Sequence, residues 1–238
     1  MRSKIALFIL LIGSVICLVG CKGNITQHTI ILYDQTEKGL TCINFEEWKA
    51  GSALTENKNN GEQLRINLIT DVGFTKPINL SIDAVPIPLL GNDYNRKTEI
   101  NTYYENVRQV FNSMGIEKSG KANSFVFKSI SEALNTLAVS HSDKKQLIVT
   151  SDLRENSPLY SFHNQEMLSI LKKSPDSVKN IFLTKYPLMD LSGIVVFLYY
   201  EPVDYSDSDV FEIIADFYVS ILTSHNATVY INEPFKTN

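Results

Sequence analysis

The sequence predicts an α/β domain with a doubly wound, mostly parallel central sheet, one antiparallel edge strand and helices on both faces. The first observation is three nearly continuous apolar segments, residues 29–33, 146–150 and 193–200, which are rich in β-branched and aromatic side chains. Such segments are typical of strands that are covered on both faces. The second observation is the alternation of apolar and polar residues in 64–68 and 78–82, which predicts a hairpin at a half-exposed edge.

Helical patterns between these strands are the third observation. Apolar residues at helical spacing predict one helix over residues 100–114, ended by Gly115, and a second helix over residues 130–138. Ser124 is the expected N-cap of the second helix. Residues 84–97, which contain two prolines and a glycine, are expected to form a loop after the edge hairpin.

A last helix and strand complete the pattern. Ser206 is the expected cap of this helix, Asp207 and Asp209 lie in its electropositive first turn, and apolar residues within 210–222 form its buried stripe. Residues 227–231 are the last predicted strand. The expected order is strand, helix, hairpin, two helices, strand, helix, strand, helix, strand, without a second domain.

The composition fits an ordinary globular domain. Of the 238 residues, 20% are charged and 44% are hydrophobic, and the formal net charge is -4. This apolar content excludes a disordered chain, and three cysteines cannot form a disulfide framework. The mild acidity argues against nucleic acid as a partner, because no basic stripe is present to replace phosphate counterions.

The N-terminus has the pattern of an export signal. Arg2 and Lys4 precede an apolar segment, residues 5–19, that is short for a transmembrane helix. The sequence Leu18-Val19-Gly20-Cys21 follows, and it resembles a bacterial lipobox, in which the cysteine is lipidated, for example with palmitate. An uncleaved anchor and a plain cleaved signal are the alternatives.

The predicted organisation is a lipoprotein signal peptide over residues 1–20, a tether over 21–27 and a single domain over 28–238. A lipid on Cys21 would attach the exported domain to the cell membrane or the outer membrane.

Polar residues follow the predicted central strands. Asp34 comes after the first strand, Ser151 and Asp152 after the fourth, and Asp204 after the fifth, while Ser124 lies at a predicted helix start. In an open α/β sheet the ligand crevice lies at the carboxyl ends of these strands. Carboxylates and hydroxyls gathered there form a set of oxygen ligands that Mg²⁺, Ca²⁺ or Mn²⁺ prefers.

These motifs resemble a known family. A strand ending in Asp-x-Thr (Asp34 and Thr36), a helix-capping Ser124 and a strand ending in Ser-Asp (Asp152) are similar to the von Willebrand factor A domain. The resemblance covers residues 28–232. It implies a metal-ion-dependent adhesion site in which these four residues hold Mg²⁺, or Mn²⁺ or Ca²⁺, and an acidic residue of a partner completes the coordination.

One position departs from the family pattern. The last residue of the first motif is Lys38, where the family has a serine. An ammonium group there repels a cation, or takes its place and pairs with Asp34 and Asp152. Two interpretations therefore stay open: an occupied metal site, and a vestigial site that Lys38 and local amides neutralise.

The function predicted from these features is binding rather than catalysis. The sequence contains no nucleophile–base pair, no Gly-x-Ser-x-Gly elbow and no phosphate-binding loop. The leading hypothesis is a lipid-anchored module that binds a protein partner of the cell envelope, with Lys38, Ser151 and Asp204 on the binding rim. A structural subunit of an envelope or conjugation-type assembly with a vestigial site is one alternative. A metal-dependent hydrolase is the other.

Overall fold

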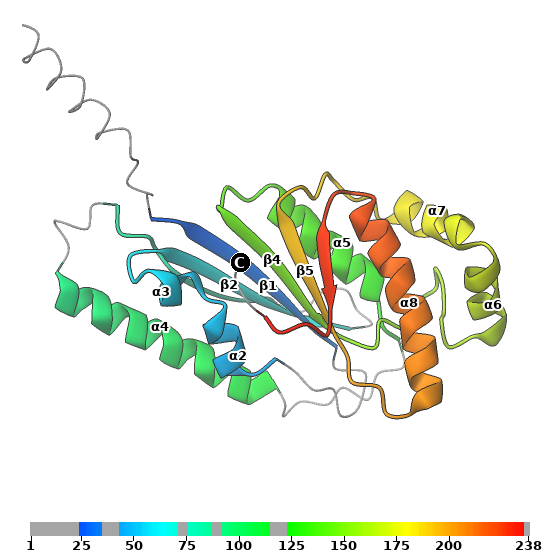
Figure 1. The fold of residues 1–238 in the computed structure, drawn as a ribbon, viewed down its shortest axis with the longest axis horizontal. Helices are drawn as coiled ribbons and strands as arrows, with labels where there is room; N and C mark the ends of the chain where they lie inside the picture. The colour runs from blue at the N-terminus through cyan, green and yellow to red at the C-terminus, as the bar shows by residue number, and fades with distance from the viewer. Residues whose placement is uncertain (1–23, 35–42, 71–75, 87–91, 115–122, 236–238) are drawn as a thin grey trace, which may run out of the picture.

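The computed structural model of the chain describes residues 24–34, 43–70, 76–86, 92–114 and 123–235 (Figure 1). Within these ranges no helix combines the length and the apolar character needed to cross a membrane.

The described residues form one six-stranded sheet in the order β3-β2-β1-β4-β5-β6. All neighbouring strands are parallel except β2 and β3, which form the antiparallel edge. This topology confirms the predicted fold class. The strands are β1 (Thr26–Asp34), β2 (Gly61–Ile69), β3 (Ile78–Ile82), β4 (Lys144–Thr150), β5 (Ile194–Tyr199) and β6 (Thr228–Ile231).

Helices cover both faces of the sheet (Figure 1). One face carries the short α2 and α3 and the long α4, and the other face carries α5 and α8, with α6 and α7 beside α8. The helices are α2 (Phe45–Ala50), α3 (Ala53–Glu56), α4 (Asp93–Met114), α5 (Val126–Ala138), α6 (Gln165–Lys173), α7 (Pro175–Lys185) and α8 (Tyr205–Thr223).

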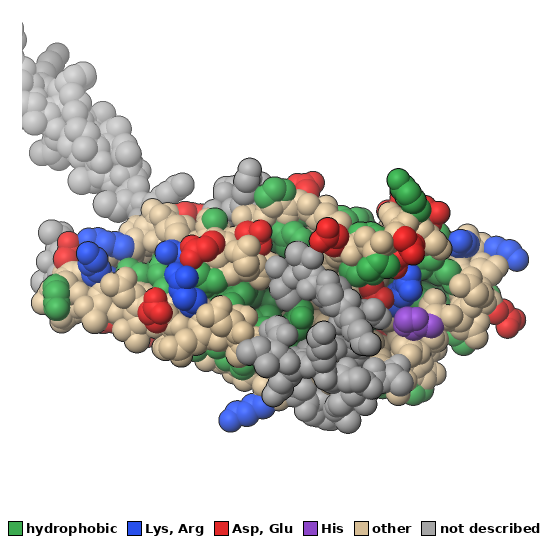
Figure 2. All heavy atoms as spheres, turned by 90° about the horizontal axis from the view of Figure 1, so that it is seen from below, with side chains coloured by type: hydrophobic (Ala, Val, Ile, Leu, Met, Phe, Trp, Pro, Cys, Tyr) green, Lys and Arg blue, Asp and Glu red, His purple; other side chains and the backbone are tan. Residues whose placement is uncertain are grey.

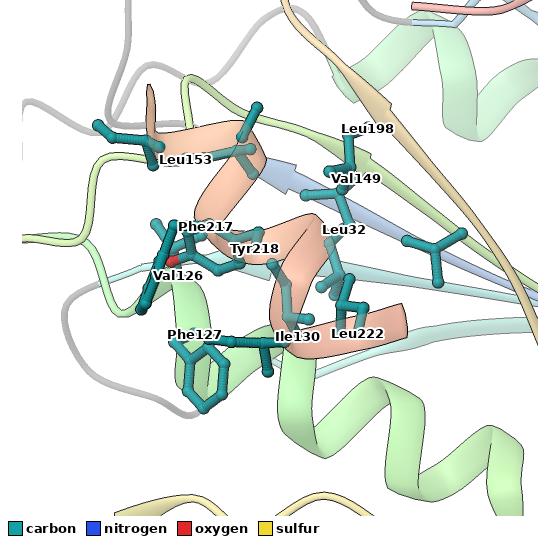
Figure 3. Close-up of a cluster of buried hydrophobic side chains, with 14 of the residues drawn as sticks. Leu32, Val126, Phe127, Ile130, Val149, Leu153, Leu198, Phe217, Tyr218 and Leu222 are labelled. Atoms are coloured by element: carbon teal, nitrogen blue, oxygen red, sulfur yellow. The ribbon is translucent and has the colours of Figure 1, made fainter. Parts of the chain in front are cut away.

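The central strands are buried on both faces, as their apolar composition predicts. Ile30 and Leu32 of β1 point into the core below α5 and α8, whereas Ile31 points into the core below α2 and α4. Figure 3 shows Leu32 together with Val149 of β4 and Leu198 of β5 beside α8. The period of two along each strand therefore divides the interior into two hydrophobic clusters.

An aromatic cluster anchors the second face. Trp48 on α2 is fully buried, and its ring lies 6.0 Å from Phe45, 6.3 Å from Tyr103 and 5.9 Å from Phe111 between ring centroids. These contacts dock α2 against α4 and make Trp48 a core residue.

The structure corrects the predicted helix starts. Ser124 does not cap α5, because its backbone forms an isolated bridge with Asn156 and its hydroxyl turns elsewhere. Ser206 lies inside α8, and the N-cap is Asp204, whose side chain accepts from the Asp207 N–H. The two corrections have different causes. Ser124 bonds to the distant Asp34 instead of the helix start, whereas Asp204, two residues before Ser206, caps α8 locally.

Three further boundaries differ from the predictions. The helix α4 begins at Asp93, inside the predicted loop 84–97. Two helices, α6 and α7, replace the one expected between β4 and β5, with Pro175 at the first position of α7. The strand β1 begins at Thr26, so it includes the last two residues of the predicted tether.

Replacing Trp48 by alanine is expected to lower the free energy of unfolding by about 3–5 kcal/mol, because the cavity left among the aromatic rings cannot close fully. Urea unfolding followed by circular dichroism measures the change. The matched control is Tyr94→Ala on α4, whose side chain is exposed, with an expected change within about 0.5 kcal/mol. Equal losses in the two variants would contradict this packing.

Candidate functional site

The carboxylate of Asp34 lies at the end of the central strand β1 and has no exposed surface. Its Oδ2 accepts hydrogen bonds from Ser151 Oγ at 2.8 Å and from Ser124 Oγ at 3.2 Å. Because Tyr33 and Thr150 are register partners in the parallel β1–β4 pair, the next residues, Asp34 and Ser151, emerge side by side. One carboxylate thereby joins the end of β1, the segment before α5 and the segment after β4.

Asp152 forms a compact turn with Arg154. The Arg154 N–H donates to Asp152 Oδ1 at 2.9 Å, and the Arg154 Nε lies 3.6 Å from Asp152 Oδ2. Leu153 between them has a φ of 61°, in the left-handed region, and its side chain is fully buried. A non-glycine residue in this region is strained. Burial of the leucine and the Leu153 N–H bond to Ser151 Oγ at 3.0 Å offset that strain.

Asp207 connects this turn to α8. Its Oδ1 accepts from Arg154 Nη2 at 2.7 Å, and its Oδ2 accepts from Tyr200 OH at 2.6 Å and from the Val203 N–H at 2.9 Å. Burial, and then the Asp207 carboxylate, raise the pKa of Tyr200, so the phenol keeps its proton and donates. The loop between β5 and α8 is therefore held at both of its ends.

Glu155 supplies the missing cap of α5. Its Oε2 accepts from the Phe127 N–H at 2.8 Å, at a helix start where the N-cap Phe125 offers no side-chain acceptor. Burial raises the pKa of Glu155 to about 7, and the Asp34 carboxylate adds to the rise. Among the described residues its Oε1 has no hydrogen-bond partner. The carboxyl group therefore titrates close to neutral pH.

The structure brings most of the predicted site residues together. Asp34, Ser124, Ser151 and Asp152 lie at the carboxyl-end rim of the sheet, and all four are buried. Asp204 lies on the same rim, where its side chain caps α8.

The predicted metal ligand Thr36, the rim residue Lys38 and the lipidation site Cys21 lie outside the described residues.

The described part of the rim does not fit a divalent cation well. Asp34 Oδ2 already accepts two hydroxyl donors, and the guanidinium of Arg154 lies beside Asp152. The positive charge of the Arg154 guanidinium repels a metal cation placed beside Asp152. Outside the undescribed segments, no group of three histidine, cysteine or acidic residues is arranged to hold a metal ion. Metal binding stays a prediction that depends on Thr36.

The same geometry disfavours a nucleophilic serine. Ser124 and Ser151 are both buried, and each hydroxyl donates its proton to Asp34. A catalytic serine must reach the substrate and pass its proton to a base. Both hydroxyls therefore satisfy a buried carboxylate.

Sequence analysis missed three residues of the rim. Glu155 and Arg154 belong to the segment that follows Ser151, but they had been given no role there. Asp207 had been assigned only to the first turn of α8. One sequence signal could have indicated Arg154: a basic residue two positions after a predicted buried aspartate.

Beside this polar layer lies a pocket of about 360 Å³. Arg154 and Asp207 line its polar side, and Phe162 and Leu168 its apolar side. Val203 and Asp204 of the β5–α8 loop also line it. Figure 2, which views the molecule from below the orientation of Figure 1, shows acidic and hydrophobic side chains interspersed over one face, with a histidine near its right-hand end.

No protein-family model matches the chain, and a comparison with curated proteins gives no match either. Among solved structures, the chain is similar to one described as the conserved hypothetical protein BatB from Bacteroides thetaiotaomicron. The sequences are 11% identical, the TM-score is 0.34, and the match covers 87% of this chain and 91% of that chain. A similarity this weak assigns a functional role to no residue. The site is therefore defined by the geometry of its own side chains.

Glu155 should make stability depend on pH. Its folded pKa of about 7 lies above the ordinary value of 4.5, so the folded state keeps a proton that the unfolded state loses. The free energy of unfolding of the wild type should therefore fall, relative to that of Glu155→Gln, by up to about 1.4 kcal/mol per pH unit between about pH 5 and pH 7.

Urea unfolding at a series of pH values measures this difference. Glutamine keeps the shape and an acceptor for the Phe127 N–H, and the exposed Glu132→Gln is the control. If the wild type and Glu155→Gln gave parallel curves, the raised pKa would be wrong.

Proposed function

We propose that the chain is an interaction module of von Willebrand factor A type, which binds a protein partner at the carboxyl-end rim of its sheet. A lipid on Cys21 holds it at the surface of a membrane in the cell envelope after export. Confinement to a membrane raises the effective concentration of the module for partners there.

The observation that carries this proposal is the exposure of two large apolar side chains on the β5–α8 loop. Val203 is 80% exposed and Tyr205 is 93% exposed. Both flank Asp204, and Val203 lines the rim pocket. Aromatic and aliphatic side chains next to a pocket are typical anchors of protein interfaces, and tyrosine is among the residues enriched in hot spots.

The loop is fixed before any partner arrives. Asp207 accepts from Arg154, Tyr200 and the Val203 backbone, and Asp204 accepts from the Asp207 N–H. A loop ordered in advance loses little conformational entropy on binding. The exposed side chains are therefore presented in a defined geometry.

Charge indicates the chemistry of the partner. Three exposed acidic residues lie within four positions of these apolar side chains in the sequence: Glu201, Asp204 and Asp209. A surface of this kind suits a partner that offers lysine or arginine beside an apolar contact. This differs from the acidic partner that a metal-bridged site would bind.

The family assignment within the proposal is supported by topology and by loop placement. The sheet is mostly parallel with one antiparallel edge. Asp34, Ser124 and Asp152 come from three separate segments that meet at one rim, as the resemblance implies. The ion pair between the partly exposed Arg154 and the buried Asp152 favours binding without a metal bridge.

A photoreactive amino acid at position 205 is expected to crosslink the chain to an envelope protein in living cells, because this side chain is the most exposed apolar group in the described part of the rim. The control position is 139, where Val139 is 62% exposed at the end of α5. Gel shift and mass spectrometry measure the product, and Cys21→Ser should move the chain out of the membrane fraction.

Two results would oppose the proposal. Equal crosslinking at positions 205 and 139 would show contact without a preferred face. Retention of the partner by a Val203→Ser, Tyr205→Ala double variant would exclude the loop as the binding surface, and would favour a structural subunit that contacts its neighbours through other helix faces.

A further inference from the structure

The outer edge of β3 has no strand partner among the residues that the structure describes. Within them β3 pairs only with β2, so the N–H and C=O groups of its other edge make no ladder bonds. Ile78 is 40% exposed, and Asn79 and Ser81 are exposed as well. An unpaired edge of this kind is a template for another strand.

The strand lacks the usual protection of an edge. Natural edge strands carry charged residues, proline or a bulge that prevents pairing with another chain. The sequence of β3, Ile78-Asn79-Leu80-Ser81-Ile82, contains no charge and no proline. Lys76 and Pro77 precede the strand and Asp83 follows it, so these protective residues flank β3 and leave its five residues themselves without charge or proline.

The strand is complementary to itself. In an antiparallel pair centred on Leu80, each Ile78 lies opposite an Ile82 of the second copy, and the two leucines lie opposite each other. On the other face each Asn79 lies opposite a Ser81. Apolar therefore meets apolar and polar meets polar at every position, which is the requirement of a twofold interface.

The charges at the two ends agree with this register. The antiparallel arrangement brings the exposed Lys76 end of one copy against the exposed Asp83 end of the other, twice in each pair. Parallel pairing would place like charges together, which is unfavourable. The charges therefore select the same direction as the side-chain pattern.

Space is available beside the edge. A groove of about 610 Å³ lies between β3 and α4. Leu80 and Ile82 line it on the strand side, and Thr98, Thr102 and Asn106 line it on the helix side. With a twofold axis perpendicular to the sheet, the two grooves would join into one cleft above the paired strands.

We propose that two copies of this chain associate through the outer edges of β3, in antiparallel register with Leu80 opposite Leu80 of the second copy. The two sheets then form one continuous sheet. The two carboxyl-end rims point to opposite ends of it. This inference does not depend on the proposed function of the rim.

Disulfide crosslinking tests the register in the full chain, expressed in a bacterial host with Cys42→Ser as the background. Leu80→Cys is expected to give a disulfide-linked dimer under mild oxidation. Residues opposite each other in an antiparallel pair have Cα atoms about 4.5–5.5 Å apart, which is within disulfide reach. The matched control is Ile78→Cys, whose two copies would lie more than about 13 Å apart.

A second pair of variants guards against misfolding at position 80. Chains carrying Ile78→Cys and Ile82→Cys are expected to crosslink when they are expressed together and not when they are expressed separately. Equal crosslinking of Leu80→Cys and Ile78→Cys would overturn the register. Absence of a dimer in both the Leu80→Cys chain and the mixed pair would overturn the proposal.

Discussion

The buried carboxylate of Asp34 is the constraint on which the rim depends. Placing a carboxylate out of water is costly unless hydrogen bonds replace the lost hydration. The hydroxyls of Ser124 and Ser151 supply two of those bonds. To do so, the segment before α5 and the segment after β4 must both reach the end of β1. The β1–β4 register brings Ser151 to this point, and the hydrogen bond to Asp34 holds the segment before α5 there as well.

Further polar contacts connect these buried groups to the β5–α8 loop at the surface. The turn after Ser151 presents Arg154, which binds Asp207, and Asp207 fixes the β5–α8 loop. The same turn places Glu155 at the start of α5, where its carboxylate accepts a hydrogen bond from the Phe127 N–H. The N-cap residue of this helix, Phe125, makes no side-chain hydrogen bond. Among the described residues, the protein's own polar side chains therefore bond to one another at the rim, which is where other α/β proteins bind a ligand. The exposed apolar groups of the loop are the proposed binding surface.

The sheet could be predicted because its signals are local. Continuous apolar segments identified β1, β4 and β5, and the alternating segment 78–82 gave the bounds of β3 without error. The cap predicted at Ser124 was wrong for the opposite reason, whereas the error at Ser206 was local, because Asp204 two residues earlier is the cap. A serine before a helix has several possible partners, and Asp34 is 90 residues away from Ser124 in the chain. No spacing rule identifies a partner at that distance, and the same holds for Arg154 and Asp207.

The most direct test of this account is thermal melting of the purified chain with Mg²⁺, Mn²⁺ or Ca²⁺ against a chelator, for the wild type and for Asp34→Ala. If Asp34 is a structural acceptor, the variant melts at a lower temperature and neither protein responds to a cation. A bound ion at about 100 times its dissociation constant stabilises a protein by about 2.7 kcal/mol, a shift of several degrees. A shift of that size in the wild type that disappears in Asp34→Ala would contradict the account and would establish a metal site.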